Sequence, residues 1–87
     1  MLKKIDIHEV LTIRHAIEKY RTQYCIMIIT SVVDQGDNDL GYVMYTADKK
    51  SDLLSVPRSE YKGMVATLMA GAATESYPQI GNVVYHD

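Results

Sequence analysis

The sequence has one cysteine, Cys25, and contains neither phenylalanine nor tryptophan. A single cysteine excludes an internal disulfide framework and a zinc site made of cysteines, and it is compatible with a reducing cytosol. Without Phe and Trp, we expect a core of Ile, Val, Leu and Met, with the seven tyrosines at its margins.

An excess of charge of either sign is also missing, because 9 Lys and Arg against 11 Asp and Glu give a net charge of −2. A dedicated nucleic-acid-binding protein usually has a basic face, so we expect no nucleic-acid partner. No long apolar run follows Lys3 and Lys4, so we expect no signal peptide, no membrane anchor and a cytoplasmic location. The length of 87 residues and the 47 % hydrophobic fraction predict one globular domain over residues 1–87.

The first predicted element is a helix that begins after Asp6 and runs to about Arg21. Asp6 with Glu9 three residues later has the spacing of a capping box, and Ile5 with Val10 has the spacing of a hydrophobic staple. The apolar residues then recur at helical spacing, which predicts a buried stripe. Its members are Val10, Ile13, Ala16, Ile17 and Tyr20.

A β-hairpin is predicted next. Residues 22–34 are rich in β-branched side chains, residues 34–41 are rich in Asp and Gly, and residues 41–47 return as a second strand. Both faces of the first strand are mostly apolar, so we expect it at the centre of the sheet. Its second face, with Cys25, Met27 and Ile29, is a candidate interaction surface.

A second helix is predicted over Ser59–Ser76, with Ser59 as its N-cap and no charged residue between Lys62 and Glu75. Its back carries small residues where a surface helix normally carries charges. That back could be exposed, covered by the chain itself, or an interface with a second subunit or another protein. Its members are Gly63, Ala66, Thr67, Ala70, Ala73 and Thr74.

Shorter strands are predicted at residues 53–56, ended by Pro57, and at residues 80–85. The last strand could pair within the chain or across subunits. The order α-β-β-(β)-α-β predicts an α+β fold with two layers, in which two helices pack on one face of an antiparallel sheet of three or four strands.

The same order, with the spaced alanines Ala66 and Ala70, resembles the front half of roadblock-type dimerisation domains over residues 6–76. In that family the second helix meets its copy across a two-fold axis. The resemblance implies a homodimer formed through Ser59–Ser76, and it rests on element order and spacing.

Few residues suggest chemistry. The spacing of Asp34, Asp37 and Asp39 does not match a calcium loop and favours local turn bonding, and His8 and His15 lie seven apart, unlike a helical metal pair. Cys25 lies in an apolar strand that gives a thiolate no stabilising charge. No catalytic motif is present, so we expect no enzymatic activity, no metal and no cofactor.

The sequence therefore favours a small protein–protein interaction module, such as an adaptor or a phage-type or host regulatory inhibitor, that binds itself as a homodimer and another protein. The alternative is a module for a small ligand or nucleotide, with a basic and tyrosine-containing rim at the start of the second helix. That rim consists of Lys49, Lys50, Arg58 and Tyr61.

Overall fold

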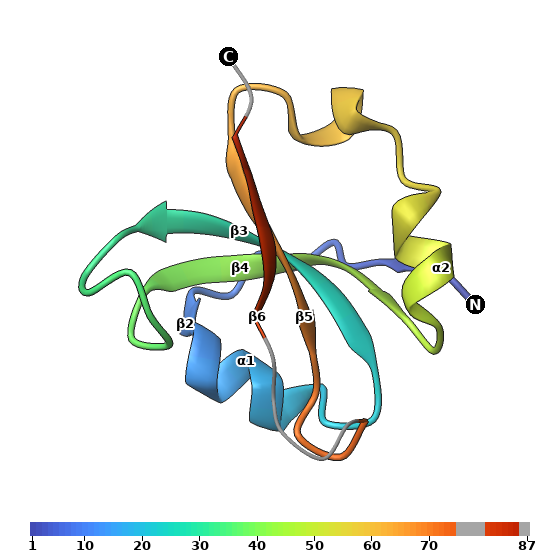
Figure 1. Ribbon diagram of the computed structural model, residues 1–87, viewed down its shortest axis with the longest axis horizontal. Coiled ribbons are helices and arrows are strands. Elements are labelled where there is room, and N and C mark those ends of the chain that lie inside the picture. Colours follow the sequence, from blue (N-terminus) through green and yellow to red (C-terminus); the bar gives the residue numbers. More distant parts are fainter. Residues whose placement is uncertain (75–79, 86–87) are drawn as a thin grey trace.

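The computed structural model describes residues 1–74 and the backbone of residues 80–85 (Figure 1). The strands are β1 (Lys3–Lys4), β2 (Leu11–Thr12), β3 (Tyr24–Ser31), β4 (Leu40–Ala47), β5 (Val65–Ala70) and β6 (Ile80–Tyr85). The helices are α1 (Ile13–Lys19), α2 (Lys50–Leu54) and the 3-10 turn η1 (Arg58–Tyr61). Two short α-helices packed with an antiparallel sheet confirm the predicted α+β class.

The sheet is larger than predicted, and its strands follow the order β1-β4-β3-β5-β6. All pairs are antiparallel, and β2 pairs with β4 off this path. The β3–β4 hairpin and the strand at residues 80–85 are confirmed. β6 pairs with β5 of the same chain, with Val84 opposite Ala66, which answers the question that the sequence left open.

The first helix is shorter than predicted. It begins at Ile13, where the Thr12 hydroxyl accepts the backbone N–H of His15 at 3.0 Å. The segments that precede it pair with β4 as β1 and β2, so their backbone groups are satisfied by a sheet rather than by a helix that starts after Asp6. Val10, predicted to be buried, is 59 % exposed.

The predicted helix over Ser59–Ser76 is wrong. The chain forms η1, turns at Gly63 with a positive φ of 79°, and continues as β5. β5 lies between β3 and β6, and the β3 partner of Ala66 is Ile28. Its small apolar residues reflect a buried strand rather than a helix back. Without a helix there, the likeness to roadblock-type domains loses its basis.

The predicted strand at residues 53–56 is wrong as well. α2 occupies residues 50–54, and the N–H of Val56 bonds to the carbonyl of Leu53 at 3.1 Å. Leu53 and Val56 are both buried, and their separation of three residues is a helical spacing that could have indicated this turn.

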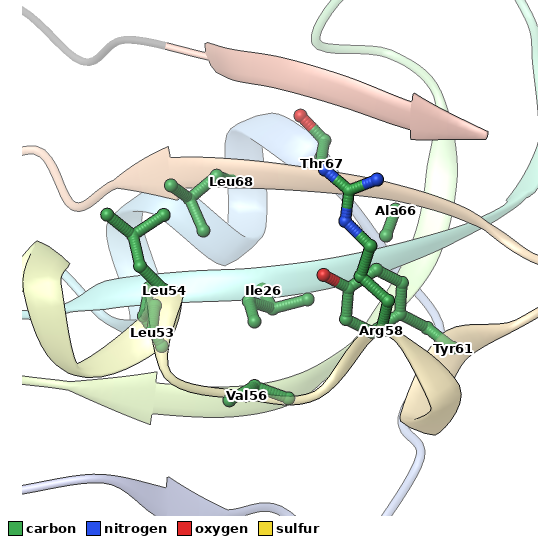
Figure 2. A pocket seen from close by; sticks show the side chains of 9 residues that line it. All are labelled: Ile26, Leu53, Leu54, Val56, Arg58, Tyr61, Ala66, Thr67 and Leu68. Atoms are coloured by element: carbon green, nitrogen blue, oxygen red, sulfur yellow. The ribbon is translucent and has the colours of Figure 1, made fainter. Parts of the chain in front are cut away.

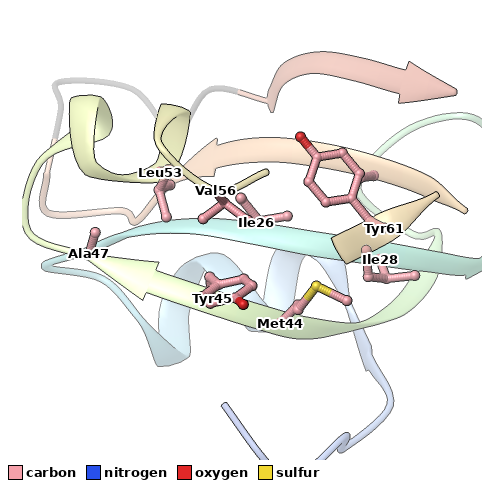
Figure 3. Close-up of a cluster of buried hydrophobic side chains, with 9 residues drawn as sticks. Ile26, Ile28, Met44, Tyr45, Ala47, Leu53, Val56 and Tyr61 are labelled. Atoms are coloured by element: carbon pink, nitrogen blue, oxygen red, sulfur yellow. The ribbon is translucent and has the colours of Figure 1, made fainter. Parts of the chain in front are cut away.

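The helices pack on opposite faces of the sheet, not on one face as predicted. On one face, Leu53 of α2, Tyr61 of η1 and Val56 of the link between them join a cluster with Ile26, Ile28, Met44, Tyr45, Ala47 and Ala66 (Figure 3). On the other face, α1 contributes Ile13, Ala16 and Ile17 to a cluster with Leu11, Cys25, Met27, Val43 and Met69. The sheet therefore lies between two apolar layers, and both faces of β3 are apolar for this reason.

Candidate functional site

The residues predicted as a helix back do not share one surface. Ala66, Thr67 and Ala70 are buried in β5, whereas Gly63 and Ala73 are exposed in separate turns. Thr74 is half-buried, and its hydroxyl donates to the carbonyl of Arg21 at 3.1 Å. These residues build the sheet and a turn, so they form no continuous patch.

The second face of the central strand is covered within the chain. Cys25 and Met27 are fully buried in the cluster that includes α1, and Ile29 packs half-buried at its edge. Burial raises the pKa of the Cys25 thiol to about 12, so the thiol stays protonated and unreactive near neutral pH. Packing inside one chain accounts for the apolar character that suggested an interface.

A groove opens between β3, β5 and the segment from α2 to η1, with a volume of about 240 Å³. Ile26, Leu53, Val56, Ala66 and Leu68 make most of its lining, with Thr67 beside them in β5. Leu54 and Arg58 stand at its rim (Figure 2). We call this site the α2 groove.

Among the described residues that line the α2 groove, Arg58 is the charged one. The two other arginines form ion pairs, Arg14 with Asp37 at 3.2 Å and Arg21 with Glu18 at 2.9 Å. Arg58 is exposed and has no ion pair or hydrogen bond within the part of the chain that the structure describes. A cation that has no partner among the described residues thus stands beside an apolar hollow.

The structure divides the predicted basic rim. Arg58 and Tyr61 line the α2 groove together, and Tyr61 is buried there. Lys49 and Lys50 lie at the start of α2, are exposed, and do not line the groove. The sequence therefore indicated two of the groove residues, and it missed the apolar lining because α2 was read as a strand.

The acidic loop between β3 and β4 is organised by its own backbone. One Asp39 oxygen accepts the N–H groups of Val33, Asp34 and Gln35 at 2.7, 3.1 and 3.2 Å. These bonds lower the pKa of the Asp39 carboxyl, and the bond from Val33 has the largest effect. Asp34 likewise accepts the N–H of Gly36 at 3.0 Å, so the predicted local bonding is confirmed for Asp34 and Asp39. The Asp37 carboxylate instead pairs with Arg14.

Within residues 1–74 and the strand at 80–85, no cluster of His, Cys, Asp and Glu could hold a metal ion. His8 stacks on Tyr42 with ring centroids 4.2 Å apart, and the backbone of His15 takes part in capping α1. His86 lies outside the described residues.

The two edges of the sheet differ. β1 is two residues long, and both of its residues are lysines. β6 is six residues long, has the sequence Ile-Gly-Asn-Val-Val-Tyr, and is the last strand on the path through the sheet. Among the described residues, β6 pairs only with β5.

A second hollow, of about 380 Å³, lies between the N-terminal segment and α1. Lys19 and Glu9 in its wall already pair with each other at 3.2 Å. Its charges are thus partly satisfied within the chain, unlike the Arg58 guanidinium.

No protein-family model, curated protein or solved structure matches this chain. Among the helices described, none is long and apolar enough to cross a membrane.

Proposed function

We propose that this chain is a small non-enzymatic protein-interaction module that forms a homodimer, and that the outer edge of β6 is the dimer contact. The observation that carries the proposal is the contrast between the two sheet edges. The two-residue strands β1 (Lys3 and Lys4) and β2 (Leu11 and Thr12) share one edge of the sheet on β4, whereas β6 ends the other edge with six residues that include no charge and no proline.

An open edge strand offers unpaired N–H and C=O groups to any strand that approaches it. Natural proteins block such edges with short strands, lysines or prolines, and β1 has two of these features. β6 has none of them along its length. Two copies of an uncharged strand can pair in antiparallel fashion without like-charge repulsion, and a two-fold contact of this kind closes on itself.

The remaining features agree with this class of function. Cys25, the one nucleophilic thiol, is buried and has a raised pKa, which suits a structural role. A free thiol is also compatible with the cytoplasm, the location that we propose. Adaptors and regulatory inhibitors remain the kinds of module that we favour.

Molar mass from light scattering over a concentration series tests the proposal. We expect a mass that rises with concentration towards twice 9.8 kDa. Val83 and Val84 provide the variants, because consecutive residues of an antiparallel strand direct their N–H groups to opposite sides. Of Val83→Pro and Val84→Pro, the substitution at the residue whose N–H points away from β5 should abolish the dimer and leave the fold intact. The substitution at the residue whose N–H points towards β5 should destabilise the sheet.

Lys4→Pro at the other edge is the matched control, and its mass should follow that of the unmodified chain. A monomeric mass at every concentration would refute the homodimer. A dimer that survives in both β6 proline variants, with the fold verified by circular dichroism, would place the contact elsewhere.

A further inference from the structure

We infer that the α2 groove is a second, separate site, which binds a segment of a partner protein made of one apolar side chain next to an Asp or Glu carboxylate. The inference does not depend on β6, because the groove is lined by β3, β5, α2 and η1. Its basis is the position of Arg58 beside apolar residues.

The charge of Arg58 determines the polar half of this ligand. Guanidinium groups pair with carboxylates through two parallel hydrogen bonds, and such charge-assisted bonds are stronger than neutral ones. Arg14 and Arg21 already have carboxylate partners in the chain, but Arg58 has no partner in the described part. A carboxylate from outside would give Arg58 the kind of contact that the other two arginines have.

The size of the groove determines the apolar half. Pockets for drug-sized ligands measure about 300–1,000 Å³. The α2 groove, at about 240 Å³, lies below that range and fits one apolar side chain better than a nucleotide. Ile26, Leu53 and Val56 provide its apolar contacts.

The rim of the groove favours a polypeptide over a free small acid. Leu54 is 70 % exposed at the rim, and Arg58 is exposed as well (Figure 2). A side chain held between them leaves its own backbone in solvent, so the chain can continue on both sides. An exposed leucine next to the hollow also offers apolar surface to the residues that flank the anchor.

Titration of the full chain with short blocked peptides, followed by amide chemical shifts, tests the inference. The probe is acetyl-Gly-Leu-Glu-Gly-amide, and the matched peptides replace Glu with Gln or Leu with Gly. We expect shifts at Leu53, Val56 and Arg58 with millimolar affinity for the probe. Each matched peptide should bind about tenfold more weakly, since it lacks either the charge or the apolar group.

Arg58→Gln should bind the Glu and Gln peptides equally, whereas Arg21→Gln, which removes one exposed arginine elsewhere, should keep the preference. Equal binding of the two peptides by the unmodified chain, or no shift with any peptide at millimolar concentration, would overturn the inference. Binding of 4-methylpentanoate without binding of the peptide would show a small-acid site and would also overturn it. The monomeric β6 proline variant should bind the probe normally, so this site and the dimer can fail separately.

Discussion

The carboxylate of Asp39 accepts the backbone N–H of Val33 at 2.7 Å, across the loop that joins β3 to β4. The same oxygen also accepts the N–H groups of Asp34 and Gln35, and Gln35 has a positive φ of 58°. One side chain thus fixes the turn of the central hairpin. Its removal would leave three backbone donors without this acceptor.

Asp39→Asn should lower the free energy of unfolding at neutral pH. Because the folded pKa of Asp39 is lowered, its stabilisation is complete above the unfolded value of about 3.9 and disappears as the pH falls through the folded pKa. The difference between Asp39→Asn and the unmodified chain should therefore shrink in acid. Urea titrations at several pH values measure it.

Asp37→Asn is the control in the same loop, because the Asp37 side chain takes part in an exposed ion pair with Arg14, and the substitution keeps the Asp37 carbonyl that accepts the Arg14 N–H. It should change the unfolding free energy by less than about 0.5 kcal/mol. An Asp39→Asn variant as stable as Asp37→Asn would show that the three backbone bonds do not hold the loop.

Thr67→Val should leave the protein as stable or stabilise it by about 1 kcal/mol. The Thr67 hydroxyl oxygen is buried in β5 and has no hydrogen-bond partner among the described residues, so its removal ends a desolvation cost. Thr74→Val should have the opposite sign, because the Thr74 hydroxyl donates to Arg21. Thermal or urea unfolding of both variants measures this, and a clear loss in Thr67→Val would contradict the assignment.

Gly71→Asn should destabilise the fold by about 1–3 kcal/mol, as overpacking does. A side chain at Gly71 would meet the backbone of Tyr20 and Arg21, and the Gly71 N–H bonds to Gln23 at 2.8 Å. Gly63→Asn provides the comparison, because Gly63 faces open space and asparagine tolerates its positive φ. Equal losses in the two variants would mean that the close approach at Gly71 is not the cause.

Leu53→Ala should cost about 2–5 kcal/mol of unfolding free energy, because Leu53 is 1 % exposed. Leu54→Ala next to it should cost less than about 0.5 kcal/mol, since Leu54 is mostly exposed. Urea titration of the pair gives a direct test of the α2 turn. Similar losses in both variants would mean that α2 packs with a different face.

The central hairpin could be predicted from the sequence because its signals are local. β-branched runs flank a loop rich in Asp and Gly, and each strand carries its own pattern. The buried stripe of Ile13, Ala16 and Ile17 was also predicted correctly. Apolar residues at helical spacing indicate a buried helix face regardless of where the helix begins. The capping-box pattern at Asp6 and Glu9 predicted the wrong start, because pairing with β4 outweighed it.

β5 could not be predicted in this way, since its pattern depends on partners far away in the chain. A strand covered on both faces loses polar alternation, and the alanines at 66 and 70 then read as helix formers. The α2 groove could not be predicted for the same reason. Arg58 and Tyr61 could be singled out by type, but Ile26 and Leu53 meet them only through the packing of α2 on the sheet.

The middle of the chain forms the middle of the sheet, and its two end segments, β1 and β6, form opposite edges. The β3–β4 hairpin closes only a short loop, whereas the pairing of β1 with β4 closes a loop of about forty residues. We therefore expect folding to start in the hairpin and to finish at the edges of the sheet. Edge segments are also the first to open. A copy whose β6 has detached would expose the edge of β5, and the β6 of a second copy would then fit that edge. Strand exchange would therefore be a second route to the homodimer that we propose.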